Sequence, residues 1–195
     1  MGESVSLKSA WDAYRAARDA GHVVTSIRYL RRITQLEPED VGAWINLADE
    51  LSEIARYEEA HKAAREALRL APPKAIPPFW LVLASIYDKQ GRFGLAERWY
   101  RKSLEHRAST TTAIHLGSLL ARRGAFAEAK KAHRLAIRVG NGAVDEAHFN
   151  LGLILRAESR LKLAIEQFDK AIELDPDYEY AKFARDDCLA ATKVR

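Results

Sequence analysis

The 195-residue sequence contains one cysteine, one methionine, six prolines and ten glycines. With Cys188 as its single cysteine, the chain cannot form an intrachain disulfide. A reducing compartment therefore suits it, and we expect a cytoplasmic location. The few prolines and glycines form no low-complexity stretch. The remaining composition, 48% hydrophobic and 30% charged, is that of an ordinary folded soluble protein.

Long apolar runs are also missing. No stretch reaches the roughly eighteen apolar residues that a membrane-spanning helix needs, so we expect no membrane span. The first residues carry neither a basic region nor an apolar block, which argues against a secretory signal. We expect residues 1–6 to be a disordered leader.

Motifs for catalysis or metal binding are absent from the sequence. The six histidines show no zinc-ligand spacing, and neither a glycine-rich phosphate loop nor a nucleophile elbow occurs. Cys188 lies beside Asp186 and Asp187, whose charges should raise its pKa, so we interpret it as a packing residue. His133 and His148 stand where packing residues are expected. We predict that the protein is not an enzyme and has neither a cofactor nor a metal site.

The net charge of +4 is unevenly distributed. Residues 145–195 hold eight Lys and Arg against eleven Asp and Glu, a net charge of −3, which leaves +7 for residues 1–144. This charge is too dilute to indicate a nucleic-acid footprint. Three basic clusters nevertheless recur: Arg28, Arg31 and Arg32; Arg98, Arg101 and Lys102; Lys130, Lys131 and Arg134.

One set of residues returns at a spacing of about 34 along the chain. Its clearest copy, within residues 41–74, has Trp44, Leu47, Ala48, Leu51, Ala60, Ala64, Ala67 and Pro72. A second clear copy, within residues 145–178, has His148, Leu151, Gly152, Leu155, Ala164, Phe168, Ala171 and Pro176. Each half of a unit shows apolar residues at helical spacing, which predicts two helices per unit.

We place five units at 7–40, 41–74, 77–109, 110–144 and 145–178, followed by a capping helix over 179–195. Small residues at the eighth and twentieth positions of a unit allow two helices to approach closely. Gly21, Gly91 and Gly124 recur at the fifteenth position, where a helix can end in a left-handed residue. The second and fifth units have Ala55 and Ser159 there. We expect those turns to be strained by about 1 kcal/mol or shaped differently.

This pattern resembles the tetratricopeptide repeat family over residues 7–178. The resemblance implies an all-α, right-handed superhelical solenoid of helix–turn–helix pairs with a concave inner face. The first unit departs from the pattern, because Trp11 is displaced by one position, Tyr14 stands at a small-residue position and Ser26 replaces an alanine. Its first helix is therefore either shifted in register or part of a divergent cap.

Two segments interrupt the period. Residues 72–78 insert two extra residues between the second and third units, as a surface loop or as a hinge. In the capping helix, we expect an apolar set to cover the fifth unit and a charged set to face water. The apolar set is Tyr180, Phe183, Ala184 and Leu189, and the charged set is Lys182, Arg185, Asp186 and Asp187.

The resemblance also implies the working surface, because the first helix of each unit lines the inner face of such an array. We predict a non-enzymatic adaptor that binds a peptide or protein segment in this groove. The predicted contact residues are Trp11, Arg15, Asn46, Asp49, Glu53, Asp88, Lys89, Ser118, Arg122 and Phe149.

Some family members bind chaperone C-terminal tails through a specific Lys–Asn–Asn–Lys–Arg set. In the first three units only Asn46 fits this set, since Trp11, Arg15, Pro78 and Val82 occupy its other positions. Later units match no better, so chaperone tails are disfavoured as partners. Two alternatives stay open. One is a homodimer through the repeat ends or the capping helix, and the other is RNA or an acidic partner on the basic convex face, with nucleic acid the less favoured.

Overall fold

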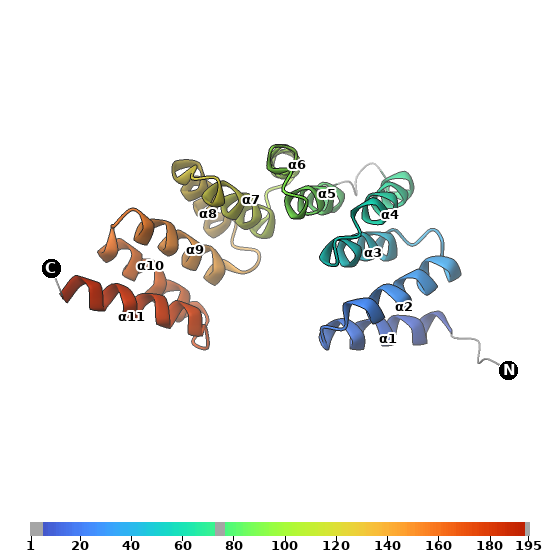
Figure 1. The fold of residues 1–195 in the computed structure, drawn as a ribbon, viewed down its shortest axis with the longest axis horizontal. Coiled ribbons are helices and arrows are strands. Elements are labelled where there is room, and N and C mark those ends of the chain that lie inside the picture. The colour runs from blue at the N-terminus through green and yellow to red at the C-terminus, as the bar shows by residue number, and fades with distance from the viewer. Residues whose placement is uncertain (1–5, 73–76, 194–195) are drawn as a thin grey trace. The chain divides into compact units, whose positions relative to one another are not determined.

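The computed structural model describes residues 6–72 and 77–193. Within these ranges the chain forms helices and turns and contains no strand, which confirms the predicted all-α repeat fold (Figure 1). The chain divides into two compact units, Met1–Trp99 and Tyr100–Arg195. From here on, the first and second units are these two, and the five units of the sequence pattern are called repeats. Residues 1–5 of the expected leader, residues 73–76 of the segment between the second and third repeats, and residues 194–195 of the expected capping helix lie outside the described residues.

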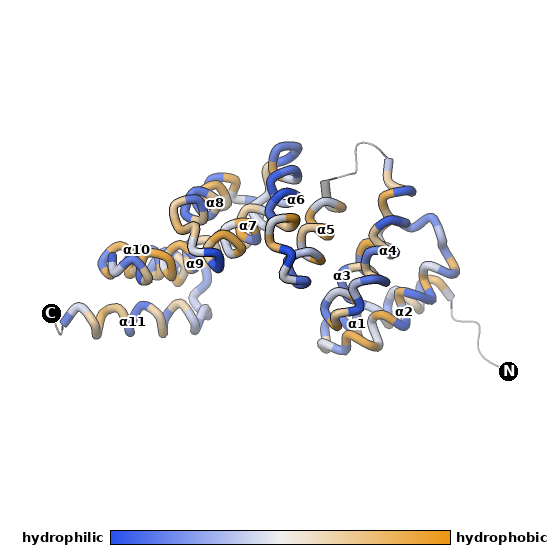
Figure 2. Tube along the Cα trace, turned by 45° about the horizontal axis from the view of Figure 1, so that its top comes forward, coloured by the Kyte–Doolittle hydropathy of each residue, from blue (hydrophilic) through white to orange (hydrophobic). Residues whose placement is uncertain are grey.

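The helices follow one another in pairs. They are α1 (Leu7–Asp19), α2 (Val23–Leu36), α3 (Val41–Glu53), α4 (Tyr57–Leu70), α5 (Pro77–Lys89), α6 (Phe93–His106), α7 (Thr110–Arg122), α8 (Phe126–Val139), α9 (Val144–Ala157), α10 (Leu161–Leu174) and α11 (Glu179–Lys193). Polar and apolar stretches alternate along each helix, as a stack of amphipathic helices requires (Figure 2). None of the described helices is both long enough and apolar enough to span a bilayer.

Three of the first helices begin at a side-chain cap. Ser6, Asp40 and Ser109 precede α1, α3 and α7, and each side-chain oxygen accepts a hydrogen bond from the backbone N–H three residues later. Such a bond satisfies one of the open donors at a helix start. Ser6, which we had assigned to the leader, is therefore the N-cap of α1.

The turn within a helix pair uses a left-handed residue. Gly21, Gly91 and Gly124 have φ of 70°, 72° and 75°. Ala55 and Ser159 adopt nearly the same conformation, with φ of 58° and 61°. Of the two outcomes expected for these turns, the chain adopts the strained one, because the geometry of the paired helices is kept where glycine is missing.

The first repeat, residues 7–40, has regular helix boundaries. Helix α1 begins and ends at the same repeat positions as α3, so its register is not shifted. Tyr14 fills the eighth position and is only 3% exposed, while Trp11 packs edge-on against its ring at a centroid distance of 5.6 Å. Ser26 is also fully buried. The repeat thus accepts a larger residue in α1 without losing its frame.

In the fourth and fifth repeats, glycine at the eighth position permits a close approach of the paired helices. A Cβ atom added to Gly117 would lie 2.6 Å from the ring of His133, and one added to Gly152 would lie 2.5 Å from the ring of Phe168. Both rings are fully buried. The eighth position is therefore small because a large side chain from the second helix occupies that space.

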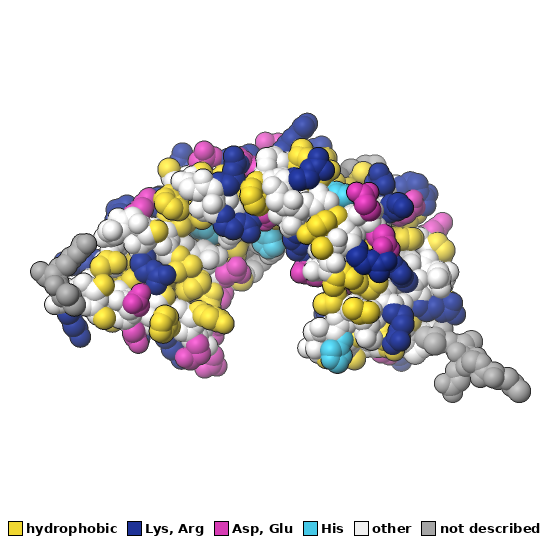
Figure 3. All heavy atoms as spheres, viewed as in Figure 1, with side chains coloured by type: hydrophobic (Ala, Val, Ile, Leu, Met, Phe, Trp, Pro, Cys, Tyr) yellow, Lys and Arg dark blue, Asp and Glu magenta, His cyan; other side chains and the backbone are white. Residues whose placement is uncertain are grey.

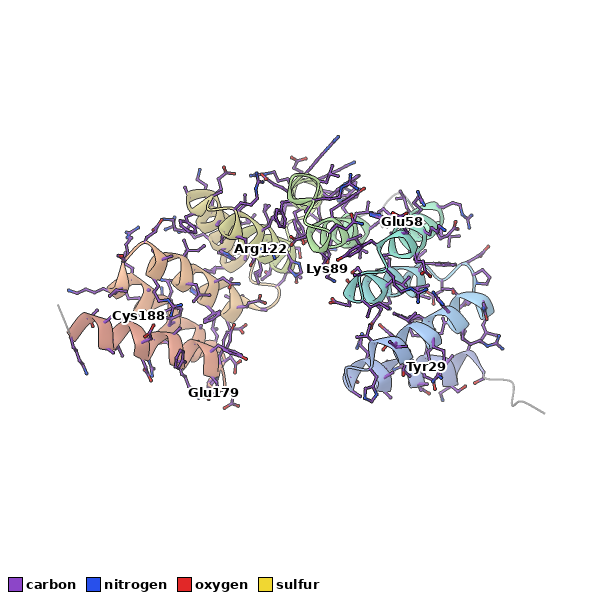
Figure 4. All side chains as sticks on the ribbon, viewed as in Figure 1. Tyr29, Glu58, Lys89, Arg122, Glu179 and Cys188 are labelled. Carbon is purple, nitrogen blue, oxygen red and sulfur yellow. The ribbon has the colours of Figure 1, made fainter. Side chains whose placement is uncertain are left out.

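The expectation for the capping helix is partly wrong. Helix α11 packs on α10 through Ala181, Ala184 and Cys188, which are all buried. Figure 4 labels Cys188 on this helix. Tyr180 and Phe183 are 76% and 74% exposed instead of covering the fifth repeat. The buried stripe consists of small residues because they allow close approach to α10, and this choice turns the two aromatic rings outward. Leu189 is also exposed, so only Ala184 of the predicted apolar set is buried.

Candidate protein-interaction surface

The predicted contact residues lie on the first helices of the pairs. We call the accessible side chains of α1, α3 and α5 the first-helix face of the first unit. Those of α7, α9 and α11 form the first-helix face of the second unit. Seven of the ten predicted residues belong to the first unit, and the other three, Ser118, Arg122 and Phe149, belong to the second.

A charged cluster joins α3 to α5 on the first unit. The Nζ atom of Lys89, at the end of α5, lies 2.6 Å from Oε1 of Glu53 and 3.5 Å from Oδ1 of Asp49. It also donates a hydrogen bond of 3.0 Å to Oγ of Ser52. The Tyr57 hydroxyl donates to the carbonyl oxygen of Lys89 at 2.9 Å and so fixes the end of α5. The structure thus brings three predicted contact residues together.

The same cluster contains more acid than base. Glu50 lies next to Asp49, and its pKa is raised, first by burial and then by the charges of Asp49 and Glu53. Three carboxyl groups therefore share this end of α3 with the ammonium group of Lys89, and the guanidinium of Arg18 on α1 also acts on Glu50, which still leaves more acid than base. Such an excess attracts a cationic group of a partner.

The other predicted residues of the first unit differ in accessibility. Asn46 is half-buried, and its amide has no hydrogen-bond partner among the described residues, so it is open to a partner's backbone. Trp11 is half-buried against the core. Arg15 is exposed and pairs with Asp12 on its own helix. Asp88 is half-buried directly before Lys89.

On the second unit, Phe149 is only partly available. Its ring lies 5.8 Å from that of Phe168 and 5.0 Å from that of Tyr178, so it also supports the core. Burial, together with nearby carboxylates of which Glu146 is the strongest, raises the pKa of Tyr178 to about 12. Ser118 is half-buried on α7, and Arg122 is exposed at its end.

Sequence reasoning missed two residues of this face. Counted from Glu179, Tyr180 and Phe183 stand at the second and fifth positions of a sixth first helix. The fifth position is also that of Trp11 and Phe149, which are predicted contact residues. The rings of Tyr180 and Phe183 are both largely exposed. The repeat spacing continues into α11 and could have indicated these two positions, whereas we expected α11 only to cover the fifth repeat.

The described residues contain no group of three His, Cys, Asp or Glu side chains placed to hold a metal ion. Burial lowers the pKa of His133 to about 4, and Nδ1 of His148 lies 2.9 Å from Oε1 of Gln167. The pKa of Cys188 is raised, as expected, but burial is the main cause and Asp187 a minor one. Packing between helices accounts for the burial of His133, His148 and Cys188.

Comparisons with known proteins identify the repeated element as a tetratricopeptide repeat. One tetratricopeptide repeat profile matches residues 145–178 and a second matches residues 45–110, together just over half of the chain. A TPR repeat-containing protein of Methanocaldococcus jannaschii is 26% identical over 154 residues, which is 79% of this chain and 27% of that protein. Human protein O-mannosyl-transferase TMTC3 is 22% identical over 173 residues, which is 81% of this chain and 19% of that protein. The chain therefore spans less than a third of either relative.

Solved structures share the fold at low sequence identity. TTC0263, a thermophilic TPR protein of Thermus thermophilus, has a TM-score of 0.77 at 15% identity, covering 95% of this chain and all of that one. YrrB, described as a TPR protein with an unusual peptide-binding site, has a TM-score of 0.60 at 18% identity, covering 94% of both chains. At these identities the likeness establishes the fold alone.

Proposed function

The chain belongs to the tetratricopeptide repeat family, and on that premise we propose that it is a non-enzymatic adaptor that binds a peptide or protein segment on its first-helix face. Tetratricopeptide repeats serve in general as protein-interaction scaffolds. YrrB, which shares the fold, has a peptide-binding site. We do not extend transferase activity from TMTC3, because this chain matches only 19% of that protein. The single cysteine supports a cytoplasmic location as part of the proposal.

The observation that carries the proposal is the acidic cluster around Lys89. The side chains of Asp49 and Glu53 are 54% and 52% exposed and that of Lys89 is 29% exposed, and ion pairs so accessible to water contribute only about 0–1 kcal/mol to stability. Folding alone therefore gives little reason for a cluster that joins the ends of two first helices. Charges arranged in this way select a partner and its orientation. The open amide of Asn46 lies on the same helix as both carboxylates, within reach of an extended backbone.

A peptide selection tests the first-helix face. Random peptides displayed on phage are selected on the full chain, and enriched peptides are measured by fluorescence anisotropy. For peptides that bind this face, Asn46→Ala/Glu53→Lys should weaken binding about tenfold, since it removes a hydrogen bond and reverses a charge. The control is Glu58→Lys, which makes the same charge change on an exposed residue of α4. Binding that survives in both variants, or falls equally in both, rejects the assignment.

A further inference from the structure

A pocket on the first unit lies among helices α2, α3 and α4. Its volume is about 570 Å³, and its floor is apolar, with Leu47, Leu51 and Ala63 all buried. The half-buried indole of Trp44 forms one wall. Its Nε1 donates a hydrogen bond of 2.8 Å to the carbonyl oxygen of Pro38, which holds the ring in place. The pocket is large enough for one or two apolar side chains of a partner.

The rim of this pocket is basic. The carboxylate of Glu59 is shared between Arg31, at 2.5 Å, and Arg56, whose Nε donates to it at 2.7 Å. Glu66, the second carboxylate, pairs with Arg69 at 2.9 Å. Lys62 and Arg65 are exposed on the rim without an ion-pair partner among the described residues. Two cations are thus available to an incoming anion.

A second hollow of about 440 Å³ adjoins the first and shares Arg31 and Gln35 with it. Its other lining residues are Val24, Ile27, Arg28, Arg32 and Arg56. We call the two hollows together the basic pocket. Six Lys and Arg side chains line it against two Glu. Figure 3 shows Lys and Arg side chains over α2 and α4, with apolar side chains between them.

The second unit supplies a matched comparison. A pocket of about 560 Å³ among α6, α7 and α8 is built from the same repeat positions. Arg101 pairs with Glu128 at 2.5 Å, as Arg31 does with Glu59, and Leu116 and Leu120 replace Leu47 and Leu51. Its rim, however, has two cations, Arg101 and Lys131, and two carboxylates, Glu105 and Glu128. The pocket is a property of the repeat, whereas the excess positive charge belongs to the first unit.

We propose that the basic pocket binds a second partner segment, an acidic peptide in which a large apolar side chain is flanked by Asp or Glu. The apolar floor would hold the anchor side chain, and the rim cations would pair with its acidic neighbours. None of the lining residues belongs to the cluster around Lys89. The proposal therefore stands independently of the first-helix face and gives the chain two separate binding surfaces.

RNA fits this surface less well. Glu59 and Glu66 interrupt the cationic rim, and a phosphate backbone tracking along it would meet both carboxylates. Among the residues that the structure describes, Trp44 is the only aromatic one lining the basic pocket. Single-stranded nucleic acid is held by successive aromatic platforms along a basic groove. A short peptide needs only one anchor and can avoid the two carboxylates.

The test uses exposed residues of the full chain. The double variant Lys62→Glu/Arg65→Glu changes the basic pocket, and Lys131→Glu/Arg134→Glu changes the same repeat positions on the second unit. Random peptides displayed on phage are selected on the wild-type chain. The affinity of each enriched peptide for both variants is then measured by fluorescence anisotropy. We expect a class that binds about tenfold more weakly to the first variant and unchanged to the second. Its members should carry Asp or Glu around a Leu, Phe or Trp.

The same class should retain its affinity for Asn46→Ala/Glu53→Lys, which separates this surface from the first-helix face. Replacing the central apolar residue by Ser should abolish binding. The proposal is overturned if no enriched peptide responds to Lys62→Glu/Arg65→Glu, if responding peptides lack acidic residues, or if both double variants act alike. A labelled oligouridine that binds the wild-type chain more tightly than these peptides would also overturn it, in favour of RNA.

Discussion

At the scale of single residues, the turn between paired helices imposes a left-handed conformation even where the chain has no glycine. Ala55 and Ser159 have φ of 58° and 61°, which costs a residue with a Cβ roughly 1 kcal/mol. We expect Ala55→Gly and Ser159→Gly each to raise the free energy of unfolding by up to about 1 kcal/mol, offset in part by the greater freedom of glycine in the unfolded chain. Urea denaturation of the full chain measures the change.

Gly124→Ala provides the opposite substitution. A Cβ added there meets no atom within 4 Å, so the expected loss of about 1 kcal/mol comes from backbone conformation and not from a clash. If Ala55→Gly destabilises the chain as Gly124→Ala does, the turn at Ala55 is not strained.

A second residue-scale constraint is the buried imidazole of His133. Neither ring nitrogen has a hydrogen-bond partner among the described residues, and burial lowers its pKa from 6.5 to about 4. A lowered histidine pKa means that the folded state favours the neutral ring. The free energy of unfolding is therefore unaffected above pH 6.5 and falls as the pH drops toward 4, by on the order of 3 kcal/mol.

The matched variant is His133→Leu, which keeps an apolar group of similar size over Gly117. Its free energy of unfolding should lose this part of the pH dependence between pH 6.5 and 4. Urea titrations of both proteins across that range check the sign. By NMR, an imidazole signal assigned to His133 that titrates near pH 6.5 in the folded protein would contradict the burial argument.

At the scale of helices, α11 shows which face of an element holds the fold. Ala184 is 3% exposed against α10, whereas Phe183, one residue earlier, is 74% exposed. We expect Ala184→Glu to lower the free energy of unfolding by roughly 2–4 kcal/mol, because it places a charge and extra volume in a close helix contact. Phe183→Ser should change it by less than about 0.5 kcal/mol. Urea denaturation distinguishes the two, and equal losses would contradict the orientation of α11.

Helix pairing was the part of the fold that the sequence could predict. Repeated small residues, prolines after the second helices and the glycine turns fix where helices start, stop and touch, and these are local signals. The face of α11 that packs on α10 was mispredicted, because the apolar side chains of Tyr180 and Phe183 suggested that both are buried. Close approach to α10 instead favours the smaller Ala181, Ala184 and Cys188.

The site was harder to predict than the fold. The period placed Asp49, Glu53 and Lys89 on first helices, but their meeting depends on how α5 packs beside α3. Phe149 occupies a predicted contact position and yet packs on Phe168 and Tyr178, a contact that no spacing rule reveals. The sequence singled out Arg28, Arg31 and Arg32 as a basic cluster open to an acidic partner, but not the pocket they line, because its floor and the rest of its rim come from three helices of two different repeats.

At the scale of the whole molecule, acid should act differently on the two compact units. The second unit contains His133, whose lowered pKa removes stability as the pH falls below 6.5. The first unit contains Glu50, whose pKa is raised by burial and by Asp49 and Glu53. A raised carboxyl pKa contributes stability that is fully present below the unfolded-state pKa and is lost as the pH rises through the folded-state pKa. The two groups therefore respond to acid with opposite signs.

Because repeats are stabilised mainly by their neighbours, such local differences need not spread over the entire chain. Hydrogen exchange at acidic and neutral pH, corrected for intrinsic rates, should show protection lost first in α7 to α10 while α1 to α4 stay protected. In His133→Leu the second unit should keep its protection at acidic pH, and in Glu50→Gln the first unit should change little. Uniform loss over both units, or earlier loss in α1 to α4, would mean that His133 does not set the acid response.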